Sequence, residues 1–86
     1  MSERNIKITV KLFAIYQEAF ETPELNLVLP EQTKVGDVLE SLIKQKPYLS
    51  QWQSVTRFGV NLQFVTADTV LNDRDEVVLI PPVSGG

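Results

Sequence analysis

The chain has 86 residues, of which 43% are hydrophobic and 22% charged, a composition typical of one small globular domain and not of a disordered segment. It contains no Cys and no His, which excludes disulfides, thiolate chemistry and catalysis or metal binding by histidine. The net charge of −3 argues against nucleic acid as the partner, and no apolar run reaches the roughly 18 residues of a membrane span. We therefore expect a cytoplasmic domain with few catalytic groups of its own.

Two alternating segments open the predicted fold. Apolar residues occupy every second position of residues 6–13, which is the pattern of a half-buried strand. A second alternation, over residues 25–29, follows Pro23 and predicts a second strand. The connection between them, residues 14–22, contains no glycine, so we expect a long loop or a short helical turn and not a tight hairpin.

The next segment has the period of an amphipathic helix. Its apolar residues are spaced three and four positions apart: Val35, Val38, Leu39, Leu42 and Ile43. Thr33 is the predicted N-cap, and Pro47 ends the helix because the residue before a proline disfavours helical geometry. Residues 48–56, which include the single Trp, predict a second short helix or an ordered loop.

Strand patterns return in the last third of the chain. Phe58, Val60 and Leu62 alternate, and residues 64–65 continue the pattern beyond a possible turn at Asn61. Residues 72–75 predict a further turn, and residues 77–80 are apolar at every position, which is typical of a central strand. One main helix packed on one face of a mixed sheet is an α+β arrangement, and we expect a single domain over residues 1–80.

The face of the sheet opposite the helix is predicted to be a protein interface. One helix can cover only one face of a small sheet, yet the last strand is apolar on both faces. An exposed apolar patch usually marks a contact with another protein. We expect this patch to be drawn from Phe58, Val60, Val78 and Ile80.

The last six residues predict an extended reactive tail. They are Pro81, Pro82, Val83, Ser84, Gly85 and Gly86. Consecutive prolines favour a stiff, extended chain, and six such residues reach about 20 Å, far enough to enter a cleft in another protein. Glycines without Cβ atoms let a narrow active site close around the backbone and reach the terminal carboxylate. A carboxylate needs activation as a mixed anhydride, and the chain lacks a Walker-type loop, so a partner must bind the activating nucleotide.

The terminal Pro-Pro-Val-Ser-Gly-Gly resembles the tail of the MoaD/ThiS family of ubiquitin-like sulfur carriers, and in particular that of the molybdopterin synthase small subunits. Residues 10–14, 33–39, 60–61 and 71–77 are similar to further family motifs in the same order. Arg74 stands where the family usually has glycine, and a positive φ there would cost an arginine about 1 kcal/mol. The resemblance implies a β-grasp fold.

The resemblance also implies a reaction cycle at Gly86. An E1-like enzyme that binds ATP and Mg²⁺ would adenylate the carboxylate of Gly86, and a sulfur donor would then displace AMP to leave a thiocarboxylate. Residues 81–86 would enter the large subunit of molybdopterin synthase, within a heterotetramer, and deliver the sulfur to cyclic pyranopterin monophosphate for molybdenum cofactor biosynthesis. The chain itself would be a non-catalytic carrier with no metal and no stably bound cofactor.

Three other interpretations remain open. A sulfur carrier for thiamin or cysteine synthesis would have nearly the same sequence features. A ubiquitin-like protein modifier would use the same Gly-Gly end to join lysines on target proteins. A β-grasp binding module would have a tail without a chemical role.

Overall fold

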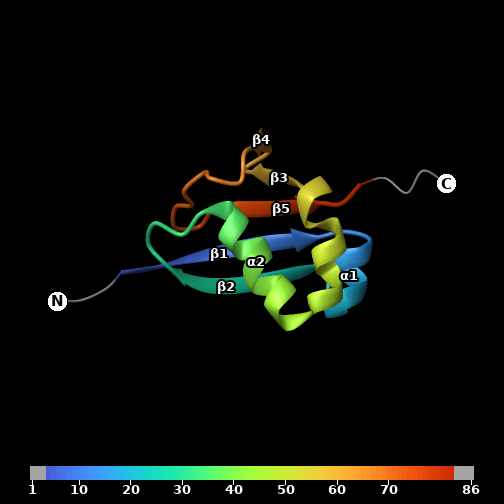
Figure 1. Ribbon diagram of the computed structural model, residues 1–86. Coiled ribbons are helices and arrows are strands. Elements are labelled where there is room, and N and C mark those ends of the chain that lie inside the picture. The colour runs from blue at the N-terminus through green and yellow to red at the C-terminus, as the bar shows by residue number, and fades with distance from the viewer. Residues whose placement is uncertain (1–3, 83–86) are drawn as a thin grey trace.

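A mixed five-stranded sheet with strand order β2-β1-β5-β3-β4 forms the framework of the structure, a computed structural model that describes residues 4–82 (Figure 1). The elements in chain order are β1 (Asn5–Leu12), α1 (Ile15–Phe20), β2 (Glu24–Pro30), α2 (Val35–Gln45), the 3-10 helix η1 (Pro47–Val55), β3 (Arg57–Val60), β4 (Gln63–Val65) and β5 (Glu76–Ile80). Strand β5 is parallel to β1 and antiparallel to β3, so the last strand lies at the centre of the sheet.

Helix α2 and η1 pack on the same face of the sheet (Figure 1). The apolar stripe of α2 is buried as predicted, with Val35, Val38, Leu39 and Leu42 each no more than 1% exposed. These side chains meet the inward residues of the strands in one core cluster. The α+β arrangement predicted from the sequence is confirmed.

The start of α2 differs from the prediction. The helix begins at Val35, and Thr33 is not its N-cap. The Thr33 hydroxyl instead donates to the carbonyl oxygen of Pro30 at 2.7 Å, because the turn after β2 brings Thr33 back to the end of that strand. The carboxylate of Asp37 accepts the N–H of Lys34 at 3.1 Å and so satisfies a donor at this end of the helix.

A two-residue turn joins β3 to β4. Asn61 and Leu62 have φ values of 51° and 71°, which is the left-handed geometry that tight hairpin turns require. The turn at Asn61 is therefore confirmed, but the prediction that Leu62 continues the alternation of β3 is wrong. Leu62 is 92% exposed at the tip of the hairpin.

The turn before β5 is held against this hairpin by a polar clasp. The side chain of Asn61 donates to Asp75 at 2.9 Å and accepts the N–H of Glu76 at 3.0 Å. Asp75 is buried and also accepts the N–H of Asn72 at 2.7 Å. Arg74 has a φ of 71°, so this chain does place an arginine in the left-handed region where glycine is usual in the family that it resembles. The motifs at residues 60–61 and 71–77 thus fix how the chain enters β5.

Candidate functional site

The sheet register places Phe58 and Val60 on the core face. Phe58 lies opposite Leu79 and Val60 opposite Val77, and Phe58 and Val60 are each only 9% exposed beneath the helices. The prediction that these two side chains belong to an exposed patch is wrong. The alternation in β3 separates two faces correctly, but only the pairing with β5 determines which face is inward.

The opposite face of β5, β3 and β4 carries an apolar surface that we call the outer patch. It consists of Leu62, Phe64, Val78 and Ile80 around Gly59. Gly59 pairs with Val78 on one side and with Phe64 on the other, so the missing side chain leaves a shallow hollow of about 200 Å³ between them. Phe64 is 75% exposed, whereas Val78 and Ile80 are half-buried.

Leu62 and Phe64 are members of this surface that the alternation of apolar residues did not predict. A glycine at the centre of β3 was the available signal, because a strand glycine often marks a close approach or a surface hollow. The two-residue turn at Asn61 then brings Phe64 beside Gly59. The patch is thus assembled by a hairpin that alternation alone does not predict.

The other half of the same sheet face is polar. Lys11 of β1 forms an ion pair with Glu24 at 2.8 Å and lies 3.9 Å from Glu76. The hydrogen bond to Glu24 raises the pKa of Lys11 above its ordinary value. Beside this pair, the hydroxyl of Thr9 donates to Asn26 at 3.2 Å. Polar groups over β1 and β2 therefore satisfy one another, whereas the apolar groups over β5, β3 and β4 have no covering element within residues 4–82 (Figure 1).

The predicted tail starts where both hydrogen-bond ladders of the central strand end. Ile80 pairs with Arg57 in the last register position of β5 with β3. Pro81 and Pro82 follow and have no N–H groups, so neither ladder can continue through them. Pro81 is half-buried and Pro82 is exposed. The remaining predicted tail residues, Val83, Ser84, Gly85 and Gly86, lie outside the described residues.

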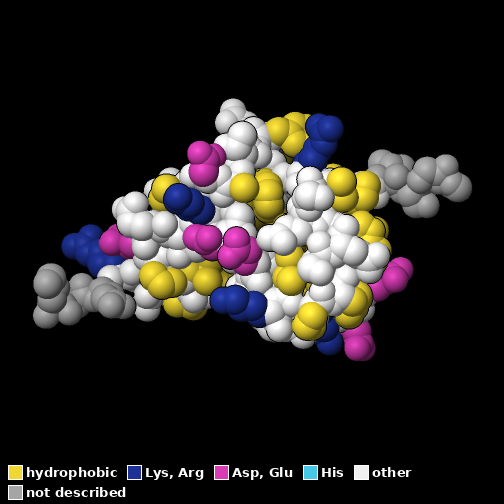
Figure 2. Space-filling model, in the orientation of Figure 1, with side chains coloured by type: hydrophobic (Ala, Val, Ile, Leu, Met, Phe, Trp, Pro, Cys, Tyr) yellow, Lys and Arg dark blue, Asp and Glu magenta, His cyan; other side chains and the backbone are white. Residues whose placement is uncertain are grey.

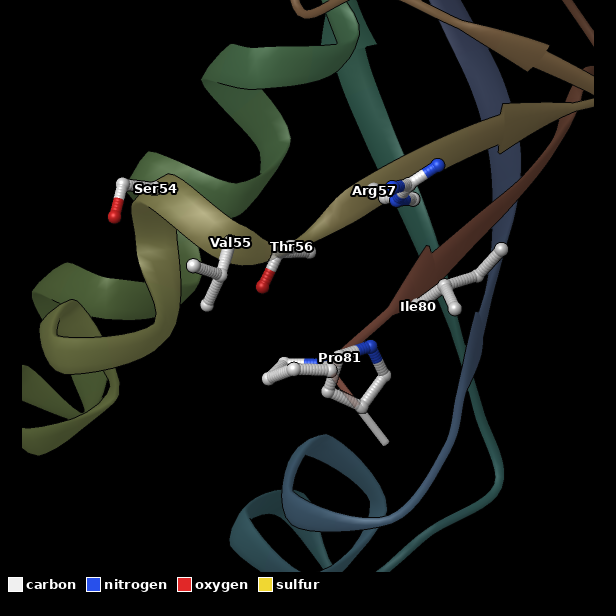
Figure 3. A pocket seen from close by; sticks show the side chains of 7 residues that line it. Ser54, Val55, Thr56, Arg57, Ile80 and Pro81 are labelled. Atoms are coloured by element: carbon white, nitrogen blue, oxygen red, sulfur yellow. The ribbon is translucent and has the colours of Figure 1, made fainter. Parts of the chain in front are cut away.

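A cleft of about 650 Å³ lies beside this exit. It is lined by the end of η1, the start of β3 and the end of β5: Ser54, Val55, Thr56, Arg57, Ile80, Pro81 and Pro82. Val55 and Thr56 point across the space toward the side of the cleft formed by Pro81 (Figure 3). Figure 2 shows hydrophobic side chains gathered at this end of the molecule. We call this feature the exit cleft.

A buried hydrogen-bond chain holds one wall of the exit cleft. The hydroxyl of Thr56 donates to the carbonyl oxygen of Trp52 at 2.8 Å, so the Tyr16 hydroxyl is the donor in its own bond to the Thr56 oxygen. Tyr16 is fully buried, and this burial raises the pKa of its phenol. These hydrogen bonds connect α1 to the end of η1, and thereby fix the backbone from which the Val55 and Arg57 side chains extend.

The described residues offer binding geometry and few catalytic groups. No group of three carboxylates or other metal-binding side chains comes together within residues 4–82. The helices within the same range are all too short to span a lipid bilayer. The fold does provide an exposed apolar surface that continues, through Ile80, to the start of the C-terminal segment.

Two curated relatives match nearly the whole chain. Both are named molybdopterin synthase sulfur carrier subunit. The protein from Mycobacterium tuberculosis is 35% identical over 82 residues, which cover 94% of this chain and 99% of the relative. The protein from Arabidopsis thaliana is 32% identical over 82 residues, which cover 95% of this chain and 85% of the relative.

Solved structures share the fold. The small archaeal modifier protein 1 from Methanosarcina acetivorans is 33% identical with a TM-score of 0.73, and the alignment covers 96% of this chain and 99% of that protein. A complex of subunits 1 and 2 of the molybdopterin-converting factor from Helicobacter pylori contains a chain with a TM-score of 0.60 at 22% identity, over 94% of this chain and 100% of that one. The ubiquitin-like β-grasp fold implied by the sequence is confirmed. A model of the ThiS family matches residues 10–86, and the chain therefore belongs to the ThiS family.

Proposed function

We propose that this chain is the sulfur carrier subunit of a molybdopterin synthase and that Gly86 carries the sulfur. The observation that supports this most directly is the near full-length similarity to two relatives of that name. The Pro-Pro-Val-Ser-Gly-Gly end and the absence of His and Cys agree with a carrier whose chemistry is performed by partner proteins.

The proposed cycle has three steps, all of which involve the terminal carboxyl group of Gly86. The Gly86 carboxylate attacks the α-phosphorus of ATP on an E1-like enzyme, which holds the nucleotide and Mg²⁺, and pyrophosphate leaves. A sulfide-level nucleophile from a sulfur donor then attacks the carbonyl of the acyl adenylate, AMP leaves, and a thiocarboxylate remains. In the large synthase subunit the sulfur passes to cyclic pyranopterin monophosphate, and water supplies the oxygen that regenerates the carboxylate of Gly86.

The outer patch is proposed to dock on the large subunit, which receives the tail. Ile80 lines both the outer patch and the exit cleft, so the docking surface and the tail are continuous. Docking of the globular part would make insertion of residues 81–86 effectively intramolecular. Because the prolines restrict the start of the tail, less conformational entropy opposes its insertion.

Intact-mass analysis of the protein purified with its pathway enzymes tests the chemistry. The expected product carries one sulfur in place of one oxygen at Gly86. The control is a deletion of Gly85 and Gly86, which should support no ATP–pyrophosphate exchange while its stability changes by less than about 0.5 kcal/mol. Exchange that continues with the deleted protein would show that Gly86 is not the site of activation.

Calorimetric titration against the large subunit tests the docking. Phe64→Ala should weaken binding, because Phe64 is the largest exposed side chain of the outer patch. Val28→Ala is the matched control, since Val28 is 61% exposed on the polar half of the sheet face. Deletion of residues 81–86 should weaken binding but leave a measurable remnant. Equal affinities for Phe64→Ala and Val28→Ala would contradict docking through the outer patch.

The alternative of a protein modifier is supported by the likeness to small archaeal modifier protein 1. In that case Gly86 would form an amide bond with target lysines. Immunoblots of cell extracts distinguish the two functions, because conjugates would form a ladder that disappears when Gly86 is deleted. A carrier for thiamin or cysteine synthesis would instead form the thiocarboxylate but fail to support molybdopterin formation with the large subunit.

A further inference from the structure

The exit cleft contains a single charged side chain. Arg57 is exposed at the start of β3, and the other lining residues are neutral. Lys11, on the same sheet face, is neutralised by Glu24, but no carboxylate among residues 4–82 lies within 4.0 Å of the Arg57 guanidinium. In a chain of net charge −3, the base of the tail thus carries a local positive charge.

Two other side chains of the lining carry hydroxyl groups, those of Ser54 and Thr56, and the hydroxyl of Thr56 is already occupied. The hydroxyl of Thr56 donates to Trp52 and accepts from Tyr16, and Thr56 is only 8% exposed. The guanidinium is therefore the charged donor that this lining offers to a ligand in the cleft. It presents a planar set of N–H groups that matches both oxygens of a carboxylate.

The shape of the cleft is set before any partner binds. The buried Tyr16 fixes the end of η1 through Thr56, and the register of Arg57 with Ile80 fixes the opposite wall. A preformed site requires little ordering on binding, which favours a specific contact. Val55, 51% exposed, and Pro81 give the cleft an apolar lining beside the charge.

We propose that the exit cleft binds the rim of the channel through which the large synthase subunit admits the tail, with an apolar side chain between Val55 and Pro81 and a carboxylate paired with Arg57. This inference rests on the proposed function. The geometric reason is that the protein that receives residues 81–86 must lie against the base of the tail, where the cleft opens. Ile80 makes this contact continuous with the outer patch.

Titration of the large subunit with full-length variants tests the pairing. Arg57→Glu should raise the Kd about tenfold and Arg57→Gln about threefold, and both should show a weaker dependence on salt than the wild type. Lys7→Glu is the matched control, because it makes the same change of charge at an exposed position of β1. Lys7 lies on the same sheet face as Arg57, but toward the end of the sheet that is remote from the exit cleft. Val55→Ser should raise the Kd about threefold through loss of the apolar contact. Denaturant midpoints of all variants confirm that each is folded.

Two results would overturn the pairing. One is a Kd for Arg57→Glu within about twofold of the wild type, and the other is an equal loss for Lys7→Glu, which would indicate only the overall charge. Failure of the proposed function has a different signature. In that case the wild-type protein would not bind the large subunit or would never acquire sulfur at Gly86, whereas failure of this inference alone leaves both wild-type properties intact.

Discussion

Substitution of Gly36 by alanine should destabilise the protein even though alanine is the better helix former. Gly36 lies in the first turn of α2, where the loop before β5 crosses the helix end. The N–H of Gly36 donates to the carbonyl oxygen of Ala67 at 2.9 Å, and the N–H of Val35 donates to Thr69 at 2.9 Å. These bonds satisfy donors that a helix start otherwise leaves unpaired.

The magnitude follows from the space available. A Cβ atom at residue 36 would lie 2.9 Å from the Ala67 carbonyl oxygen and 3.0 Å from the Ala67 Cβ, so the loop must move. Overpacking costs about 1–3 kcal/mol and a weakened hydrogen bond about 1 kcal/mol, against a helix-propensity gain of about 1 kcal/mol. We therefore expect Gly36→Ala to lower the free energy of unfolding by about 1–3 kcal/mol.

Gly59→Ala is the control for this experiment. A Cβ at residue 59 would lie 3.6 Å from the nearest atoms of Gln63 and Val78, which is ordinary contact, so stability should stay within about 0.5 kcal/mol or rise. Denaturant unfolding measures both variants, and for a domain of this size 1 kcal/mol shifts Tm by about 4–8 °C. A Gly36→Ala protein at least as stable as the wild type would refute the argument. Partial recovery in the double variant with Ala67→Gly would support it.

Three further changes test the core, the clasp and the buried phenol. Leu39→Ala should cost about 2–5 kcal/mol in unfolding free energy by cavity formation, and an equal effect of the exposed control Lys44→Ala would contradict the assigned helix face. Asn61→Ala should cost about 1–3 kcal/mol in the same assay, because it leaves the buried Asp75 carboxylate short of a partner. Since burial raises the pKa of Tyr16 in the folded protein, stability should be complete below the unfolded value of about 10 and fall as pH rises through the folded value. Tyr16→Phe should flatten that fall, and an unchanged alkaline profile would exclude Tyr16 as its source.

The helix and the general fold were predictable because they depend on local periodicity. The apolar stripe recurs along the eleven residues of α2, and Pro47 marks the end of the helix. The composition of residues 81–86 was equally visible in the sequence. Both features are properties of contiguous segments, for which spacing and backbone chemistry suffice.

The faces of the sheet were not predictable in the same way. Whether Phe58 points inward depends on its pairing with Leu79, about twenty residues further along the chain. The role of Thr33 also depends on a residue outside the helix. Its hydroxyl bonds to the Pro30 carbonyl and does not cap α2. The exit cleft combines η1, β3 and β5, so Arg57 could be recognised as part of it only once these elements were placed together.

The central position of β5 determines how the domain responds when the tail is pulled. A force applied along the strand toward Pro81 is shared by the ladder with β1 on one side and the ladder with β3 on the other. Because the backbone hydrogen bonds of both ladders lie across the direction of the force, many must slide together, and none can open singly from one end. A partner that pulls on the tail therefore works against two ladders of hydrogen bonds. An edge strand in the same place would be held by one ladder only and would be pulled out of the sheet more easily.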